Sequence, residues 1–148
     1  QSVNCLPNSL TYLCLGYNFN QPINCLPSSL EILYLSDNFN YPLKNLPIKL
    51  IELVLGHSYN QSIDYLPDSI KVLILSDNFN QNIFKLPNNL KKLYFTYQSK
   101  FNKLIYNYPK NGLSFSIISL GQAVIRLLSI LTKTSVVSPV CSSVFSSL

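Results

Sequence analysis

The chain has 148 residues, 47% of them hydrophobic and 11% charged, with a formal net charge of +5. It has four glycines and no phosphate-binding glycine loop, and none of its four cysteines forms a C-x-x-C pair. We therefore expect no enzyme activity, no cofactor and no structural zinc site.

A leucine-proline step recurs every twenty residues. It stands at Leu6-Pro7, Leu26-Pro27, Leu46-Pro47, Leu66-Pro67 and Leu86-Pro87. The chain therefore divides into five repeats with a degenerate remnant that ends at residue 107. The repeats cover residues 1–20, 21–40, 41–60, 61–80 and 81–102. Because each unit of a repeat protein packs on its neighbours, this repeat predicts a solenoid.

Positions within a repeat are counted here from Gln1, and positions 10 to 18 read L-x-x-L-x-L-x-x-N. This is the core pattern of leucine-rich repeats. Leu13 and Leu15 alternate with Tyr12 and Cys14, which is the period of a strand. We predict a strand near positions 12–16 of each repeat, with positions 13 and 15 inward, and a parallel sheet of five strands. Proline lacks a backbone donor, so the convex side is predicted to be extended or 3₁₀.

Asparagines follow the predicted strands at two positions of the repeat. They are Asn18, Asn38 and Asn78 at position 18, and Asn20, Asn40, Asn60 and Asn80 at position 20. Asparagine side chains carry both donors and acceptors and can satisfy backbone groups where the chain turns. We expect them to align into ladders along the stack.

The side chains at positions 12 and 14 are predicted to point outward from the sheet. They are Tyr12, Cys14, Ile32, Tyr34, Glu52, Val54, Val72, Ile74, Lys92 and Tyr94. A solvated sheet face normally carries polar residues, so this apolar face with aromatic rings indicates a surface that binds a protein partner. The alternative is that another segment covers the face, or that tight packing tolerates it.

Position 17 forms a row along one rim of the predicted sheet. It is occupied by Tyr17, Asp37, His57, Asp77 and Tyr97. His57 is the only histidine and has an aspartate on each side in the stack. A catalytic pair is conceivable, but neither a nucleophile nor an oxyanion site accompanies it, so we interpret the row as polar contacts.

Six lysines lie between Lys85 and Lys110. They suggest an alternative function, the binding of nucleic acid or an acidic partner at the basic end of the solenoid. The residues that would carry it are Lys91, Lys92, Lys100 and Lys103, with Tyr94 and Tyr97.

Cys5 and Cys25 share one position in neighbouring repeats, where strand spacing would bring them within disulfide range. With no signal peptide in view, we interpret them as reduced thiols in a cytoplasmic protein.

The residues after 107 change character. Apolar residues there fall at helical spacing: Ile117, Leu120, Val124, Leu127, Leu128 and Leu131. We predict an amphipathic helical cap over residues 108–134 and a loose serine-rich tail over 135–148. Alternatives are a membrane contact through residues 113–131, or aberrant sequence. The chain begins inside a repeat without methionine, so we expect it to be part of a longer protein.

The link between repeats carries a second motif. It reads FNQPI at Phe19–Ile23, FNYPL at Phe39–Leu43, YNQSI at Tyr59–Ile63 and FNQNI at Phe79–Ile83. Followed by Leu-Pro, this pattern over residues 1–107 resembles the FNIP repeat, a leucine-rich-repeat relative typical of slime moulds and giant amoeba viruses. Twenty-residue leucine-rich repeats of bacterial effectors are similar in their Leu-Pro turns but lack the Phe-Asn-x-Pro-Ile signature.

The FNIP resemblance implies a non-catalytic binding role in the cytoplasm, which would be the host cytoplasm if the protein is viral. Many FNIP proteins carry an F-box at the N-terminus and are thought to present substrates to a ubiquitin ligase. The resemblance implies that adaptor role here only if an F-box precedes these residues.

Overall fold

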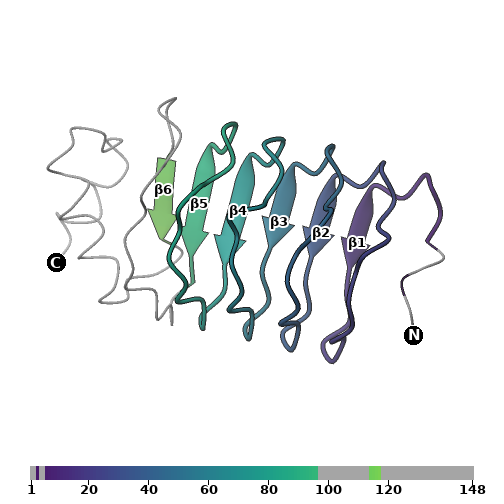
Figure 1. The fold of residues 1–148 in the computed structure, drawn as a ribbon, viewed down its shortest axis with the longest axis horizontal. Coiled ribbons are helices and arrows are strands. Elements are labelled where there is room, and N and C mark those ends of the chain that lie inside the picture. The colour runs from purple at the N-terminus through teal and green to yellow at the C-terminus, as the bar shows by residue number, and fades with distance from the viewer. Residues whose placement is uncertain (1–2, 4–5, 97–113, 118–148) are drawn as a thin grey trace, which may run out of the picture.

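The computed structural model describes residue 3, residues 6–96 and the backbone of residues 114–117. Six short strands form one parallel sheet in chain order (Figure 1). They are β1 (Tyr12–Cys14), β2 (Ile32–Tyr34), β3 (Glu52–Val54), β4 (Val72–Leu75), β5 (Lys92–Phe95) and β6 (Ser114–Ile117). Within the described residues there is no helix. The solenoid with a leucine-rich-repeat-like parallel sheet is therefore confirmed.

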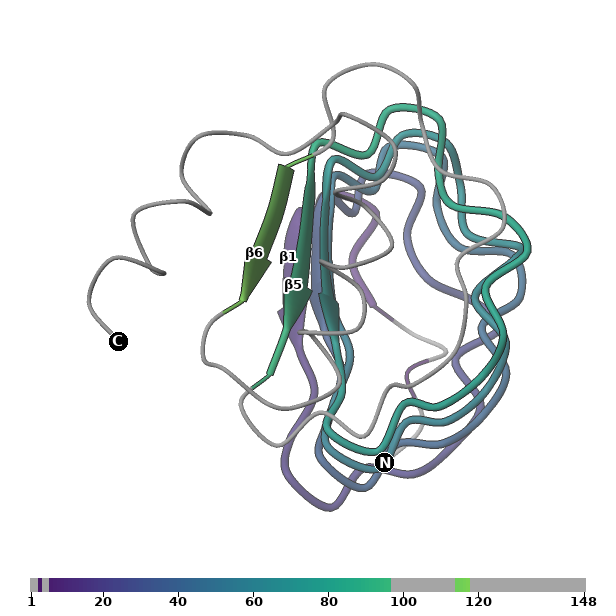
Figure 2. The same cartoon turned by 90° about the vertical axis from the view of Figure 1, so that its left-hand side faces the viewer.

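The register of the sheet follows the sequence repeat. Leu13 pairs with Leu33, and Leu33 with Leu53, so equivalent positions lie side by side on neighbouring strands. The same twenty-residue step continues through β5. Figure 2 looks along this stack and shows the sheet as one wall and the returning loops as the other.

Each returning loop is extended and contains two tight turns. After the Leu-Pro step, the amide of position 10 donates to the proline carbonyl three residues back, as from Leu50 to Pro47 at 3.1 Å. After the strand, the amide of position 19 closes a second turn, as from Tyr59 to the Gly56 carbonyl at 3.1 Å. Proline fits the first turn because it presets φ and leaves its carbonyl free to accept. The described convex side is thus extended, with single turns and no 3₁₀ helix.

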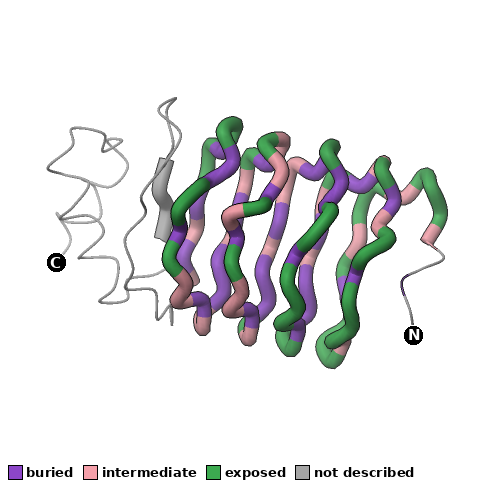
Figure 3. The backbone as a smooth tube through the Cα atoms, in the orientation of Figure 1, coloured by how far each residue is buried: buried purple, intermediate pink, exposed green. Residues whose placement is uncertain are grey.

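Buried residues recur along every turn of the solenoid (Figure 3), and the hydrophobic core that they form joins the strands to the returning loops. Leu33, Leu53, Leu73 and Leu93 at position 13 are fully buried, as predicted for inward positions. Aromatic rings at position 19 form a second row. The Phe39 ring stacks on that of Phe19 at a centroid distance of 6.5 Å and on that of Tyr59 at 6.3 Å.

The predicted asparagine ladder is also present. The Asn20 side-chain oxygen accepts from the Asn40 amide at 3.3 Å, and Asn40 in turn accepts from the Asn60 amide at 2.9 Å. Asn60 repeats the contact with Asn80 at 2.8 Å. Each link joins one repeat to the next, so these asparagines hold the turns in register where sheet pairing has ended.

The prediction of five strands is wrong, because β6 adds a sixth. Leu93 pairs with Phe115, twenty-two residues on. Pairing with residues 114–117 gives the edge of β5 hydrogen-bond partners it would otherwise lack. These four residues lie in the segment 108–134 for which a helix was predicted, so that prediction is wrong for them. The other residues of that segment, of the proposed membrane contact at 113–131 and of the tail 135–148 lie outside the described residues.

Two remaining sequence-based expectations concern thiols and membranes. Cys14 and Cys25 are free thiols, whereas Cys5 lies outside the described residues. A search of the described residues for a helix long and apolar enough to span a membrane finds none.

Candidate functional site

The outward face of the sheet brings the predicted contact residues together in two rows. The position-14 row runs Cys14, Tyr34, Val54, Ile74 and Tyr94, with direct pairing between neighbouring strands. The position-12 row runs Tyr12, Ile32, Glu52, Val72 and Lys92. Strand residues alternate between buried inward positions and these outward ones, so all ten side chains share one face.

Most of this face is apolar and only partly covered. Tyr34, Val54, Ile74 and Tyr94 are half-buried by their neighbours, while Tyr12 is 49% exposed. Five side chains abreast at strand spacing give a flat strip that offers packing area without a deep cavity. Such a strip is suited to contact with another surface rather than to enclosing a small molecule.

A diagonal of contacts orders the first half of the face. The rings of Tyr12 and Tyr34 meet edge to face with centroids 5.6 Å apart. The Tyr34 hydroxyl donates to Glu52 Oε1 at 2.7 Å. That hydrogen bond, with partial burial and the nearby carboxylate charge, raises the pKa of Tyr34. Two tyrosines and a carboxylate are thus held across β1, β2 and β3 before any partner arrives.

The rim at position 17 lies at the carboxyl ends of the strands and contains a cavity of about 410 Å³. Tyr17, Asp37, His57 and Asp77 line it, together with Asn38 and Thr96. His57 Nδ1 lies 2.8 Å from Asp77 Oδ2. Tyr97, the remaining predicted rim residue, lies outside the described residues.

The rim cavity lacks the geometry of a nucleophilic site. The Ser76 hydroxyl, which lines the cavity, donates to the Tyr59 carbonyl at 2.6 Å, so its proton is not directed at His57. In the described part of the chain, no three His, Cys, Asp or Glu side chains are placed to hold a metal ion. The arrangement offers hydrogen bonds and negative charge rather than an activated nucleophile.

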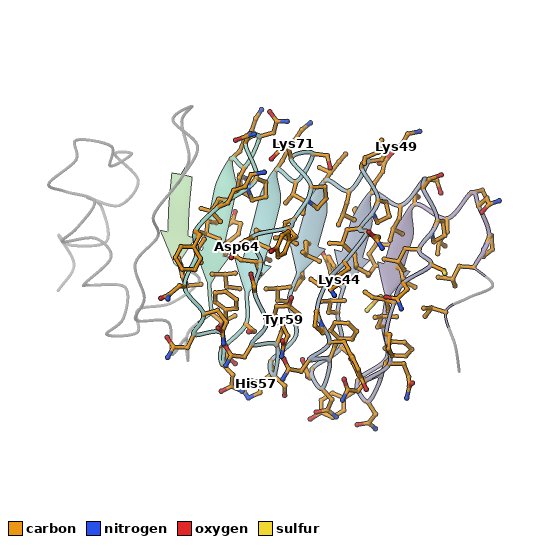
Figure 4. The ribbon with its side chains drawn as sticks, in the orientation of Figure 1. Lys44, Lys49, His57, Tyr59, Asp64 and Lys71 are labelled. Atoms are coloured by element: carbon orange, nitrogen blue, oxygen red, sulfur yellow. The ribbon has the colours of Figure 1, made fainter. Side chains whose placement is uncertain are left out.

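The basic surface suggested by the sequence is described only in part. Lys91 and Lys92 are exposed, at the start of β5, whereas Lys100 and Lys103 lie outside the described residues. Figure 4 shows Lys49 and Lys71 at the amino-terminal ends of the strands and His57 at the opposite ends. The lysines at position 9, 11 or 12 thus lie at one end of the strands, and the rim acids lie at the other end.

Three polar residues of the rim cavity escaped the sequence analysis. Asn38 was assigned only to the turn, and Ser76 and Thr96 were not singled out. All three follow from the repeat, because positions 16 and 18 flank the rim position 17. Their positions next to the polar row could have been read from the repeat numbering.

Comparison with known proteins agrees with this architecture. The model of the FNIP repeat family matches residues 2–38, 22–58, 39–77 and 59–98. The crystal structure of CroV588, described as a novel circular LRR protein, is similar, with a TM-score of 0.69 and 38% sequence identity. The likeness covers 76% of this chain and 18% of CroV588, so this chain spans less than a fifth of that protein's length. No match was found among curated proteins.

Proposed function

The chain belongs to the FNIP repeat family and has a leucine-rich-repeat-like fold, and from this premise we propose that it is a non-catalytic scaffold that binds a protein partner through the outward face of its sheet. The observation that carries the proposal is the continuous position-14 row, from Cys14 to Tyr94, in which exposed or half-buried apolar and aromatic side chains line five strands. Contiguous exposed apolar surface of this kind marks interaction sites.

Tyr34 and Tyr94 are the expected anchors of the contact. Aromatic side chains are enriched at the centres of interfaces, because they bury much area and lose little rotamer freedom. Tyr34 is already fixed by its bond to Glu52, which lowers the entropic cost of binding. Val54 and Ile74 lie between the two tyrosines and supply the apolar centre.

The narrower form of the proposal is a substrate adaptor for a ubiquitin ligase in the cytoplasm. It requires an F-box outside these 148 residues, and the sequence of the full coding region would test for one. The free thiols of Cys14 and Cys25 suit a reducing compartment.

The test is a quantitative binding comparison on immobilised protein. The double variant Tyr34→Ala with Tyr94→Ala should lose the proteins that the parent chain retains, while its circular dichroism is unchanged. Tyr65→Ala is the matched control, because Tyr65 is 84% exposed and lies outside the sheet. A Tyr34→Phe variant keeps the ring and removes only the hydroxyl, so it separates the loss of the bond to Glu52 from the loss of the ring.

Retention of the same proteins by the double variant would rule out the outward face as the contact surface. Equal losses from the Tyr65→Ala control would do so too, because the binding would then follow total aromatic exposure and not this face.

A further inference from the structure

The rim cavity carries negative charge that no lysine or arginine among the described residues pairs with. Asp37, His57 and Asp77 occupy position 17 of three consecutive repeats, so strand spacing sets them side by side. Among the described residues the ion pairs are His57 with Asp77 and Lys85 with Asp68. Lys49 and Lys71 lie at the opposite, amino-terminal ends of the strands (Figure 4). Asp37 therefore faces solvent at the cavity without a lysine or arginine paired to it.

Two hydrogen-bond donors of the cavity are directed to other parts of the protein. Asn38 Nδ2 donates to Asn18 Oδ1 at 3.0 Å, and the Ser76 hydroxyl donates to the Tyr59 carbonyl. An ionised carboxylate only accepts, so the contact of Asp77 with His57 is a hydrogen bond in the tautomer that has its proton on His57 Nδ1. One N–H of Asn38 and the O–H of Ser76 therefore do not point at a ligand in the cavity.

Carboxylate and amide oxygens remain at the cavity, together with the Thr96 hydroxyl, which is hydrogen-bonded to no described residue and can accept as well as donate. The Asp37 carboxylate is exposed, and the amide oxygen of Asn38 stays available beside it. Asp77 Oδ1 is buried, and no described residue donates a hydrogen bond to it, so its charge adds to the negative potential of the cavity. The Tyr17 ring, 67% exposed, lies one repeat away from Asp37 and supplies an aromatic face.

We propose that this cavity binds the guanidinium group of an arginine side chain, with Asp37 as the paired carboxylate and Tyr17 as the stacking ring. A guanidinium has five N–H donors and no acceptor, which complements a cavity whose charged groups are carboxylate acceptors. Its planar fork pairs with a carboxylate through two parallel bonds and stacks on aromatic rings. A metal ion is a poorer match, because the described residues supply no set of three suitable ligands.

The arginine is one presented by the partner protein, and in this respect the inference rests on the proposed function. The rim adjoins the carboxyl ends of the strands whose outward face carries the apolar rows, so one partner can reach both. The apolar rows would supply contact area, and the cavity would select a partner with an arginine at the right place.

The experiment uses small probes and the chain as it stands. L-argininamide is titrated against the protein while the ring signals of His57, the only histidine, are followed by NMR. Saturable shifts are expected with L-argininamide and none with L-citrullinamide, whose urea side chain has nearly the same shape as the guanidinium side chain but no charge. Asp37→Asn should weaken the binding at least about tenfold, equivalent to about 1.4 kcal/mol. Asp68→Asn, an exposed acid on the loop side, is the matched control and should leave it unchanged.

Three results would overturn the inference: equal shifts with L-citrullinamide, undiminished binding in Asp37→Asn, or an equal loss in Asp68→Asn. Saturation of the His57 ring shifts by Zn²⁺ alone, at lower concentration than L-argininamide, would replace it with a metal site. The outward face plays no part in these titrations. A failure here therefore leaves the Tyr34 and Tyr94 experiment standing, and a failure there leaves the cavity standing.

Discussion

The first and third repeats carry equivalent apolar residues at equivalent positions, and at positions 13 and 19 they bury them to different degrees. Leu53 in the third repeat is 0% exposed, whereas Leu13 in the first is only half-buried. At position 19, Tyr59 is 0% exposed and Phe19 is half-buried. The first repeat contains the edge strand β1, while the third has a neighbour on both sides. The burial of a repeat is therefore supplied by the repeats next to it and not by its own sequence.

The glycines at position 16 show the same dependence on neighbouring repeats. A Cβ atom added to Gly56 would lie 1.8 Å from the Ser36 carbonyl oxygen of the preceding repeat, whereas one added to Gly16 would meet nothing within 4 Å. The same residue type is thus tightly packed in the middle of the stack and open to solvent at its edge. Pairs of matched substitutions in the two regions can break this comparison or make it quantitative.

The largest difference is expected at the aromatic row. Phe39 is 0% exposed between the rings of Phe19 and Tyr59, so Phe39→Ala should lower the free energy of unfolding by about 3–5 kcal/mol. Phe19→Ala should cost clearly less, because Phe19 is half-buried and its site is open on one side. Urea denaturation followed by circular dichroism measures both. Equal losses would contradict the idea that neighbouring repeats supply the burial.

The glycine pair comes next. Gly56→Ala should destabilise by about 3 kcal/mol, because the clash is with backbone, which cannot rotate away as a side chain would. Gly16→Ala should be neutral or slightly stabilising, since alanine restricts the unfolded chain and meets open space. The two variants differ only in position, so their difference in denaturation midpoint isolates the contact with Ser36. A tolerated Gly56→Ala would show that the repeats can separate at this point.

Much of the fold could be predicted because the same apolar positions return every twenty residues. Leucine at positions 13 and 15 alternates with variable residues, which predicts inward and outward faces, and the register follows from the period. The strand β6 was missed because Leu93 and Phe115 are twenty-two residues apart and break that period. The sequence does alternate between polar and apolar residues over Ser114, Phe115, Ser116 and Ile117. This strand signal covers only four residues, whereas the helical spacing that starts at Ile117 continues to Leu131.

The site was less predictable than the fold, since it depends on contacts between repeats. The outward face follows from alternation alone, but the bond from Tyr34 to Glu52 joins residues eighteen apart and needs the register and a rotamer. The rim was noticed as a row of polar residues. That Ser76 turns its proton toward Tyr59, and Asn38 toward Asn18, could be known only from side-chain geometry.

A smaller effect is expected at the two serines of position 16. Ser76 is 1% exposed and its hydroxyl donates to the Tyr59 carbonyl, so Ser76→Ala should cost about 1–3 kcal/mol by leaving a buried acceptor without this donor. Ser36 makes the same bond to Phe19 in the half-buried first repeat, where water can replace the hydroxyl. Ser36→Ala should therefore cost less in the same denaturation experiment. The reverse order would mean that water does not reach the first repeat.

The smallest expected effect tests the diagonal that links the first three repeats. The bond to Glu52 raises the pKa of Tyr34 above the ordinary tyrosine value of about 10. Glu52→Gln removes the charged acceptor and should lower that pKa, measured by NMR titration of ring-labelled tyrosine. A raised pKa in the folded chain adds stability that is complete below pH of about 10 and is lost as pH rises through the folded pKa of Tyr34. Parent and Glu52→Gln chains should therefore converge in stability at strongly alkaline pH. An unchanged Tyr34 pKa in Glu52→Gln would mean that partial burial, and not the link to the third repeat, holds this ring's proton.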